Sequence, residues 1–137
     1  MNVTVSRKAH FNAAHRLYRK DWTDEQNDVI FGKCSNPNFH GHNYELIVSI
    51  TGPIDPNTGY VMDMKILKDH IKSEVEDAFD HKNLNLEVQE FADTIPTAEN
   101  IVVVIYNKLK KVLTSDQSME VVLYETPRNF VTYSEKL

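Results

Sequence analysis

HGHNYELIVSIT, residues 40–51, carries the clearest strand pattern of this chain. Its side chains project alternately to two faces, as in a half-buried β-strand. One face holds Tyr44, Leu46, Val48 and Ile50. The other holds Glu45, Ile47, Ser49 and Thr51. Residues 3–15 are extended in character as well, because their apolar residues share one parity: Val3, Val5, Phe11 and Ala13. The sequence therefore predicts two long strands near its N-terminal end.

Two amphipathic helices and two short strands are expected further on. Asp63 is the expected N-cap of a helix over about 64–79. Its apolar residues recur at every fourth position: Leu67, Ile71, Val75 and Phe79. Thr97 is the expected N-cap of a second helix, which follows Pro96. The apolar stripe of that helix is Ile101, Ile105, Leu109 and Val112. Strands are predicted over about 119–125 and 129–134, and the polar stretch 17–33 is interpreted as a loop.

The order β-β-α-α-β-β predicts an α+β fold in a single domain over residues 1–137. Both helices are expected on one face of a four-stranded antiparallel sheet. The other face still carries apolar residues such as Ile47 and Val122. We therefore expect further subunits to cover it, with strands closing into a barrel that leaves no free edge.

Composition excludes several classes of protein. The chain has 137 residues, 41% hydrophobic and 26% charged, which is ordinary for a globular domain. A net charge of -5 argues against a general nucleic-acid binder, which needs a basic face. No apolar run approaches the roughly 20 residues that span a membrane, and the N-terminus has no signal-peptide pattern. The single cysteine, Cys34, fits a reducing compartment, so a cytoplasmic location is expected.

Histidines and the cysteine form a candidate metal site. His40 and His42 are two residues apart, so both side chains leave the same face of an extended segment. With His15 they would offer three imidazoles to a zinc ion and leave its fourth position open, as in catalytic sites. Cys34 is then a candidate base or nucleophile. Alternatively, Cys34 is a fourth ligand, which would make the site closed and structural.

Three further positions have both a functional and an ordinary interpretation. The Asp80-His81 pair follows the first helix and suits a proton relay, because a carboxylate orients a histidine; the alternative is a helix C-cap. Glu125 ends a strand and can accept two parallel N–H bonds from a planar amino-heterocycle, or can be an ordinary exposed glutamate. Glu99, like Thr97, lies at the start of the second helix, where a carboxylate favours the helix terminus.

Taken together, these motifs resemble the 6-pyruvoyl-tetrahydropterin synthase family, together with its close relative 6-carboxy-tetrahydropterin synthase. The resemblance covers nearly the whole chain in the right order. It is carried by residues 11–17 (FNAAHRL), 31–34 (FGKC), 36–37 (NP), 40–44 (HGHNY), 55–59 (DPNTG), 80–84 (DHKNL), 97–100 (TAEN) and 124–127 (YETP). Two positions depart from the pattern: Phe39 stands where many relatives have glycine, and Ala98 where the animal enzymes have a second threonine.

The resemblance implies a role for each candidate residue. The zinc ligands would be His15, His40 and His42, and the catalytic thiol would be Cys34. Asp80 and His81 would be its relay partners, and Glu125 would anchor the pterin with help from Thr97 and Glu99. The implied fold is the tunnelling fold, in which trimers form a twelve-stranded barrel and two trimers stack as a homohexamer with active sites between subunits.

The implied substrate is 7,8-dihydroneopterin triphosphate, a small molecule. The pyruvoyl product requires triphosphate elimination with an internal redox change, and the carboxy product releases acetaldehyde; both remain open. Some of four basic residues are candidates for binding the triphosphate: Arg16, Arg19, Lys20 and Lys33. Other functions left open are a non-catalytic pterin-binding module and a structural zinc protein. The three histidines argue against a dihydroneopterin aldolase, whose chemistry needs no zinc site.

Overall fold

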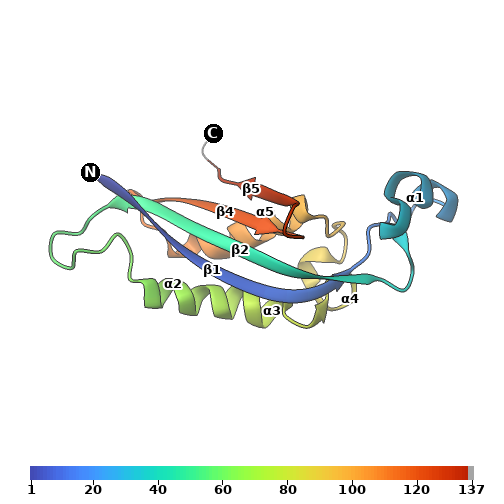
Figure 1. The fold of residues 1–137 in the computed structure, drawn as a ribbon, viewed down its shortest axis with the longest axis horizontal. Helices are drawn as coiled ribbons and strands as arrows, with labels where there is room; N and C mark the ends of the chain where they lie inside the picture. Colours follow the sequence, from blue (N-terminus) through green and yellow to red (C-terminus); the bar gives the residue numbers. More distant parts are fainter. Residues whose placement is uncertain (136–137) are drawn as a thin grey trace.

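The computed structural model describes residues 1–135 and has one mixed sheet with helices on one face (Figure 1). The sheet order is β3-β1-β2-β4-β5. Its strands are β1 Asn2–His15, β2 His40–Pro53, β3 Lys82–Asn83, β4 Ser118–Tyr124 and β5 Phe130–Tyr133. The four long strands pair antiparallel, as expected. The two-residue β3, which pairs parallel with β1, is a fifth strand that the sequence pattern did not predict.

The first predicted helix contains a π turn. It runs as α2 Met64–Ile71, a π segment Lys72–Glu76 and α3 Asp77–Phe79. An α-helix advances by about 100° per residue, so apolar residues spaced by four drift by about 40° at each step. The wider π turn cancels this drift. All four residues of the stripe are therefore buried against the sheet: Leu67, Ile71, Val75 and Phe79.

The second predicted helix is α5 Ala98–Leu109 and is capped by Thr97, whose hydroxyl accepts from the Asn100 amide at 3.1 Å. Its stripe packs on β4 and β5, while α2 packs on β1. Between the two helices lie α4 Leu84–Glu87 and a short 3-10 turn Gln89–Phe91. The predicted α+β class, with helices on one face of the sheet, is confirmed.

The stretch 17–33 is not simply a loop. It contains α1 Asp24–Phe31, followed by a 3-10 turn Gly32–Ser35, and α1 stands apart from the sheet at one end of the molecule (Figure 1). Thr23 and Gln26 form a reciprocal capping box at its start. The helix was missed because its apolar side chains do not form a buried stripe: Val29 and Ile30 are 81% and 63% exposed.

The core lies between the sheet and the helices and continues toward the histidines. Phe11 stacks on Tyr44 with ring centroids 4.9 Å apart and meets Phe79 edge-on. On the opposite face of the sheet Ile47 and Val122 are half-buried in the single chain, and barrel closure by other subunits stays a prediction. In the part of the chain that the structure describes, no helix has the length and apolar character of a membrane span.

Candidate metal centre and active site

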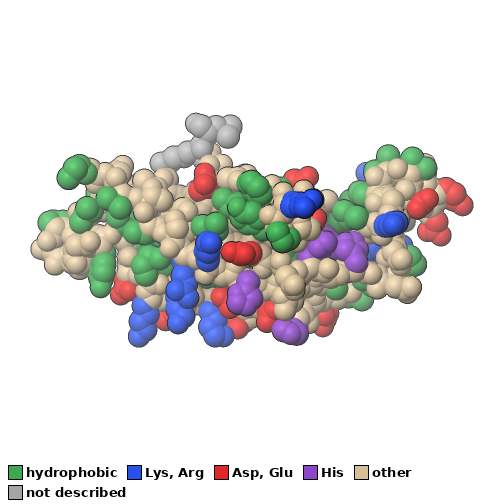
Figure 2. All heavy atoms as spheres, in the orientation of Figure 1, with side chains coloured by type: hydrophobic (Ala, Val, Ile, Leu, Met, Phe, Trp, Pro, Cys, Tyr) green, Lys and Arg blue, Asp and Glu red, His purple; other side chains and the backbone are tan. Residues whose placement is uncertain are grey.

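Strand pairing brings three histidines from two distant segments together. In the β1–β2 register His15 faces His40, and Ala13 faces His42. All three imidazoles project to the helix-covered face, beyond the last core aromatic, Tyr44. Their ligand nitrogens lie within 4.8 Å of one another, and the structure thus forms a group that can hold a metal ion. Figure 2 shows histidine side chains lying side by side on the surface between the main body and the projecting α1.

The His15 ring is oriented for ligation. Its Nδ1–H donates to the Pro96 carbonyl at 2.8 Å, since a carbonyl can only accept. This bond fixes the tautomer and leaves the lone pair of Nε2 free. His15 is 1% exposed, and Nε2 is buried with no hydrogen-bond partner. A buried nitrogen without a partner is costly unless a ligand satisfies it, so the donor set fits a divalent cation.

Burial favours the neutral form of His15 and His40. Burial lowers the pKa of His15 from 6.5 to about 4, and the neighbouring His40 and His42 push it in the same direction, against the Pro96 carbonyl. Burial, followed by His42, also lowers the pKa of His40, although Glu125 opposes the shift. Neutral imidazole is the form that binds metal, so the lowered pKa values of His15 and His40 favour binding of a cation.

Glu125 and Tyr44 complete the surroundings of the cluster. Glu125 follows β4, and its Oε2 lies 3.9 Å from His15 Nε2 with the side chain 24% exposed. The Tyr44 hydroxyl lies 3.3 Å from His15 Nδ1. Burial, aided by the charge of Glu125, raises the pKa of Tyr44, which therefore stays a neutral hydroxyl. The site thus combines a metal-binding group with a carboxylate at its margin.

Comparison with known proteins identifies the family. Residues 4–136 match the family model described as 6-pyruvoyl tetrahydropterin synthase. The chain is 49% identical over 129 residues to the 6-pyruvoyl tetrahydrobiopterin synthase of Pongo abelii and 47% identical to that of Homo sapiens, covering 94% of this chain and 89% of each relative. The chain belongs to the 6-pyruvoyl tetrahydropterin synthase family.

A solved structure supports the same assignment. The 6-pyruvoyl tetrahydropterin synthase of Caenorhabditis elegans superposes with a TM-score of 0.91 at 40% identity, covering 99% of this chain and 97% of that one. Similarity to 6-carboxy-5,6,7,8-tetrahydropterin synthases is weaker, at 28% identity for the protein of Rickettsia conorii. The family recognised from the sequence motifs, and its tunnelling fold, are confirmed.

Not every site residue predicted from the synthase motifs joins the histidine group. Cys34 is half-buried in the 3-10 turn and is not a member of the metal-binding group in the described residues. This placement disfavours the closed four-ligand alternative. Thr97 is occupied as a helix cap but lies next to Pro96, which orients His15. Glu99 is exposed in the first turn of α5, where it complements the helix terminus.

The Asp80-His81 pair lies at another place, directly before β3 and on the side of β1 that pairs with β3. Asp80 Oδ2 contacts His81 Nδ1 at 2.9 Å, and Asp80 Oδ1 accepts from the Asn12 amide at 2.8 Å. The Asn12 bond, followed by His81, lowers the pKa of Asp80 and keeps it ionised. The His81 amide donates to the Asn12 carbonyl at 2.6 Å, which requires a left-handed backbone at His81 with φ 60°. The pair is preformed, with the His81 side chain 78% exposed.

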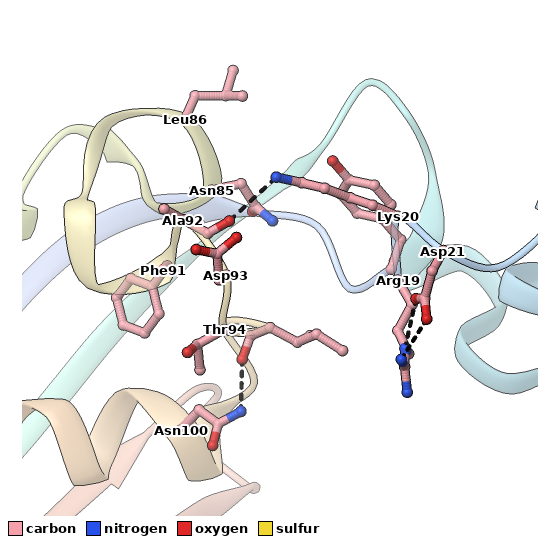
Figure 3. A pocket seen from close by; sticks show the side chains of 12 residues that line it. Arg19, Lys20, Asp21, Asn85, Leu86, Phe91, Ala92, Asp93, Thr94 and Asn100 are labelled. Carbon is pink, nitrogen blue, oxygen red and sulfur yellow. Dashed lines mark hydrogen bonds and ion pairs between the residues drawn. The ribbon is translucent and has the colours of Figure 1, made fainter.

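A cavity of about 580 Å³ lies between the segment that follows β1 and the segment that precedes and begins α5 (Figure 3). It is lined by residues 18–21 on one side, and by residues 85–86, residues 91–95 and Asn100 on the other. Lys20 reaches across it to the Ala92 carbonyl at 3.2 Å, and Arg19 pairs with Asp21 at 2.6 Å (Figure 3). Two of the basic side chains considered for triphosphate binding therefore already have partners in the isolated chain.

Proposed function

We propose that this protein is a zinc-dependent 6-pyruvoyl-tetrahydropterin synthase that acts on 7,8-dihydroneopterin triphosphate. The observation that carries the proposal is the unsatisfied Nε2 of His15, held by Pro96 beside His40 and His42. The fold itself does not require His15 Nε2 to lack a hydrogen-bond partner, so its free lone pair supports a role in binding a ligand. Membership of the family supplies the reaction type, and the relatives support the pyruvoyl product, since their identities of 38–49% exceed the 28–29% of the carboxy-type proteins.

The three histidines would hold zinc through neutral nitrogens. A bound zinc ion would polarise the substrate's side-chain hydroxyls and make the adjacent C–H more acidic. Cys34 would accept that proton, because it is the chain's one thiol and its turn is hydrogen-bonded to the residues that follow His15. Glu125 would bind the amino-heterocycle through paired N–H bonds, beside the metal group.

Asp80 and His81 would return a proton to the ring, after which triphosphate leaves by elimination. The pair fits a relay because Asp80 is kept ionised and orients the exposed His81 ring. It lies on a different edge of β1 from the histidine group. We propose that both groups act in active sites between subunits of the homohexamer implied by the family. The cytoplasmic location also stays a prediction.

Product analysis tests the proposal. Zinc-loaded protein is incubated with 7,8-dihydroneopterin triphosphate, and the pterin is weighed by mass spectrometry while released triphosphate is measured. A product that retains its three-carbon side chain supports the pyruvoyl reaction. Loss of two carbons as acetaldehyde would instead assign the carboxy reaction. Pterin binding without turnover would leave a binding module, and zinc without pterin binding would leave a structural zinc protein.

The Cys34→Ala variant tests the role of the thiol. We expect unchanged zinc content and pterin affinity but loss of triphosphate release by a factor of about 10² to 10⁴, since general-base catalysis contributes about that much. Ser73→Ala, an exposed change on the π turn, is the matched control for removal of one polar atom. Zinc loss in Cys34→Ala would indicate a ligand rather than a base.

A further inference from the structure

Arg16 directly follows His15, and both its backbone N–H and its backbone carbonyl are hydrogen-bonded to one side chain. The Asn85 side chain accepts from the Arg16 amide at 2.8 Å through Oδ1 and donates to the Arg16 carbonyl at 2.9 Å through Nδ2. The Asn85 side-chain amide thus pairs with the Arg16 backbone as a neighbouring strand would, one residue beyond the end of β1. The backbone leaving the metal ligand His15 is thereby fixed.

From this fixed backbone, two hydrogen bonds reach the turn that carries Cys34. The Arg16 guanidinium donates through Nε to the Ser35 carbonyl at 2.7 Å. The Leu17 amide donates to the Cys34 carbonyl at 2.8 Å. The guanidinium also stacks over the Tyr18 ring, 3.8 Å from its centroid. Two successive carbonyls of the Cys34 turn are therefore attached to the segment that follows His15.

The turn's other hydrogen bonds are internal or run to α1, where the Asp28 carbonyl accepts from the Gly32 amide. Ser35 Oγ donates to the Gly32 carbonyl, and the Asn36 amide donates to the Lys33 carbonyl. Such bonds shape the turn but do not fix its distance from β1. The bonds from Arg16 and Leu17 supply that missing constraint. Of the two, only the Arg16 bond is made by a side chain and can be changed by substitution.

We propose that Arg16 is a positioning residue whose Nε–H holds the turn that carries Cys34 at a fixed place relative to the segment that follows His15. This inference rests on the proposed function, in which Cys34 is the base. A displacement of about 1 Å at a reacting group can cost about 10²-fold in rate. The same geometry assigns the Arg16 side chain to the protein's own turn rather than to the substrate triphosphate.

Three substitutions separate a positioning role from a role of the positive charge. Glutamine has an N–H donor at the same number of bonds from Cα as the arginine Nε, but no charge. Lysine keeps the charge but has a carbon at that position, with its donor one atom further out. Methionine has a similar length and neither property. Arg16→Gln, Arg16→Lys and Arg16→Met therefore differ in one feature at a time.

A positioning role predicts that Arg16→Gln keeps kcat within about 3-fold of the parent, whereas Arg16→Lys and Arg16→Met lose about 10- to 100-fold in kcat with KM and zinc content little changed. Iodoacetamide should alkylate Cys34 faster in the lysine and methionine variants than in the glutamine variant. A triphosphate contact predicts the reverse order, with Arg16→Lys active and Arg16→Gln impaired in KM. That order, equal loss in all three variants, or no loss in any of them would overturn the proposal.

The matched control is the same trio at Arg7, an exposed arginine on β1. It lies eight residues before His15, about 26 Å away along an extended strand. The Arg7 variants should match the parent in kcat and in alkylation rate. Alkylation needs no turnover, so it tests the attachment of the turn even if the parent releases no triphosphate and the proposed function fails.

If the Arg16 variants do not fold, the parent protein still tests the attachment. Arg16 Nε–H should give a slowly exchanging NMR signal in protein labelled with ¹⁵N at arginine, assigned through its nuclear Overhauser contact with the Tyr18 ring, over which the guanidinium stacks. Rapid exchange of that proton, at the rate of exposed guanidinium groups, would contradict the bond to Ser35 and remove the proposal.

Discussion

Acidification of the metal-free protein should destabilise it through His15. The unfolded chain binds a proton at this residue with a pKa near 6.5, whereas burial in the native state lowers the pKa to about 4. Between these values the unfolded state holds more protons, so the free energy of unfolding falls as the pH falls. The stabilisation is fully present above about pH 6.5 and is lost on the way down to about pH 4.

The magnitude follows from the two pKa values. A tenfold difference in proton affinity corresponds to about 1.4 kcal/mol, so the full loss below pH 4 is about 3 kcal/mol. About 2 kcal/mol of this should be lost already between pH 7.5 and pH 5. His40 acts in the same direction, because its pKa is lowered as well. A variant at His15 is therefore needed to isolate the contribution of that residue.

His15→Asn is the matched variant. The asparagine Nδ2 occupies a place similar to His15 Nδ1 and can still donate to the Pro96 carbonyl, but nothing on it titrates. Urea unfolding of chelator-treated parent and variant at both pH values gives the comparison. The parent should lose about 2 kcal/mol more than the variant on acidification, whatever their difference at pH 7.5. Equal losses in the two proteins would refute the claim that His15 is held neutral by burial.

Two further predictions concern the fold around the site. Asn27→Leu should lower the free energy of unfolding by about 2–3 kcal/mol, because the buried Asn27 amide makes three hydrogen bonds at the start of α1. The control is Asn107→Leu, a change at an exposed asparagine. Equal urea midpoints for the two variants would contradict the prediction. Deletion of Ser73 should cost less than about 1 kcal/mol, since Phe79 then follows Leu67 by eleven positions, close to three α-helical turns. Insertion of an alanine at the same place should cost at least about 3 kcal/mol by turning Phe79 from the core, and thermal unfolding that ranks the two changes the other way would reject the account of the π turn.

Local patterns predicted the parts of the fold whose stabilising interactions are local or periodic. Alternation identified β2, and Asp63 and Thr97 were correctly expected as N-caps. The projecting α1 was missed because a helix that buries almost nothing leaves no periodic apolar signal. Its stabilising contacts are the capping box and Asn27, whose bonds to Arg19 depend on tertiary geometry. The sequence alone does not reveal such contacts.

The candidate site also has features that the sequence reveals and features that only the folded structure reveals. The H-x-H motif indicates which two rings share a face, but the encounter with His15 depends on the β1–β2 register. The carbonyl of Pro96, which fixes the His15 tautomer, is a backbone group and leaves no mark in the residue types. Nor could a residue pattern show that Asp80 and His81 lie on another edge of β1. All three features depend on strand pairing and tertiary packing, which residue types alone do not specify.

Backbone strain adds an independent sign of function. Among the residues that the structure describes, the non-glycine residues with positive φ are Phe39 at 66° and His81 at 60°. Phe39 directly precedes His40 of the histidine group, and it stands where the family resemblance places glycine in many relatives. His81 cannot be replaced by glycine without losing the ring that meets Asp80. A left-handed residue costs about 1–3 kcal/mol and persists only where its surroundings enforce it. One strained position adjoins the histidine group and the other lies in the Asp80-His81 pair, so the strain is concentrated at the two groups of side chains that the proposed reaction uses.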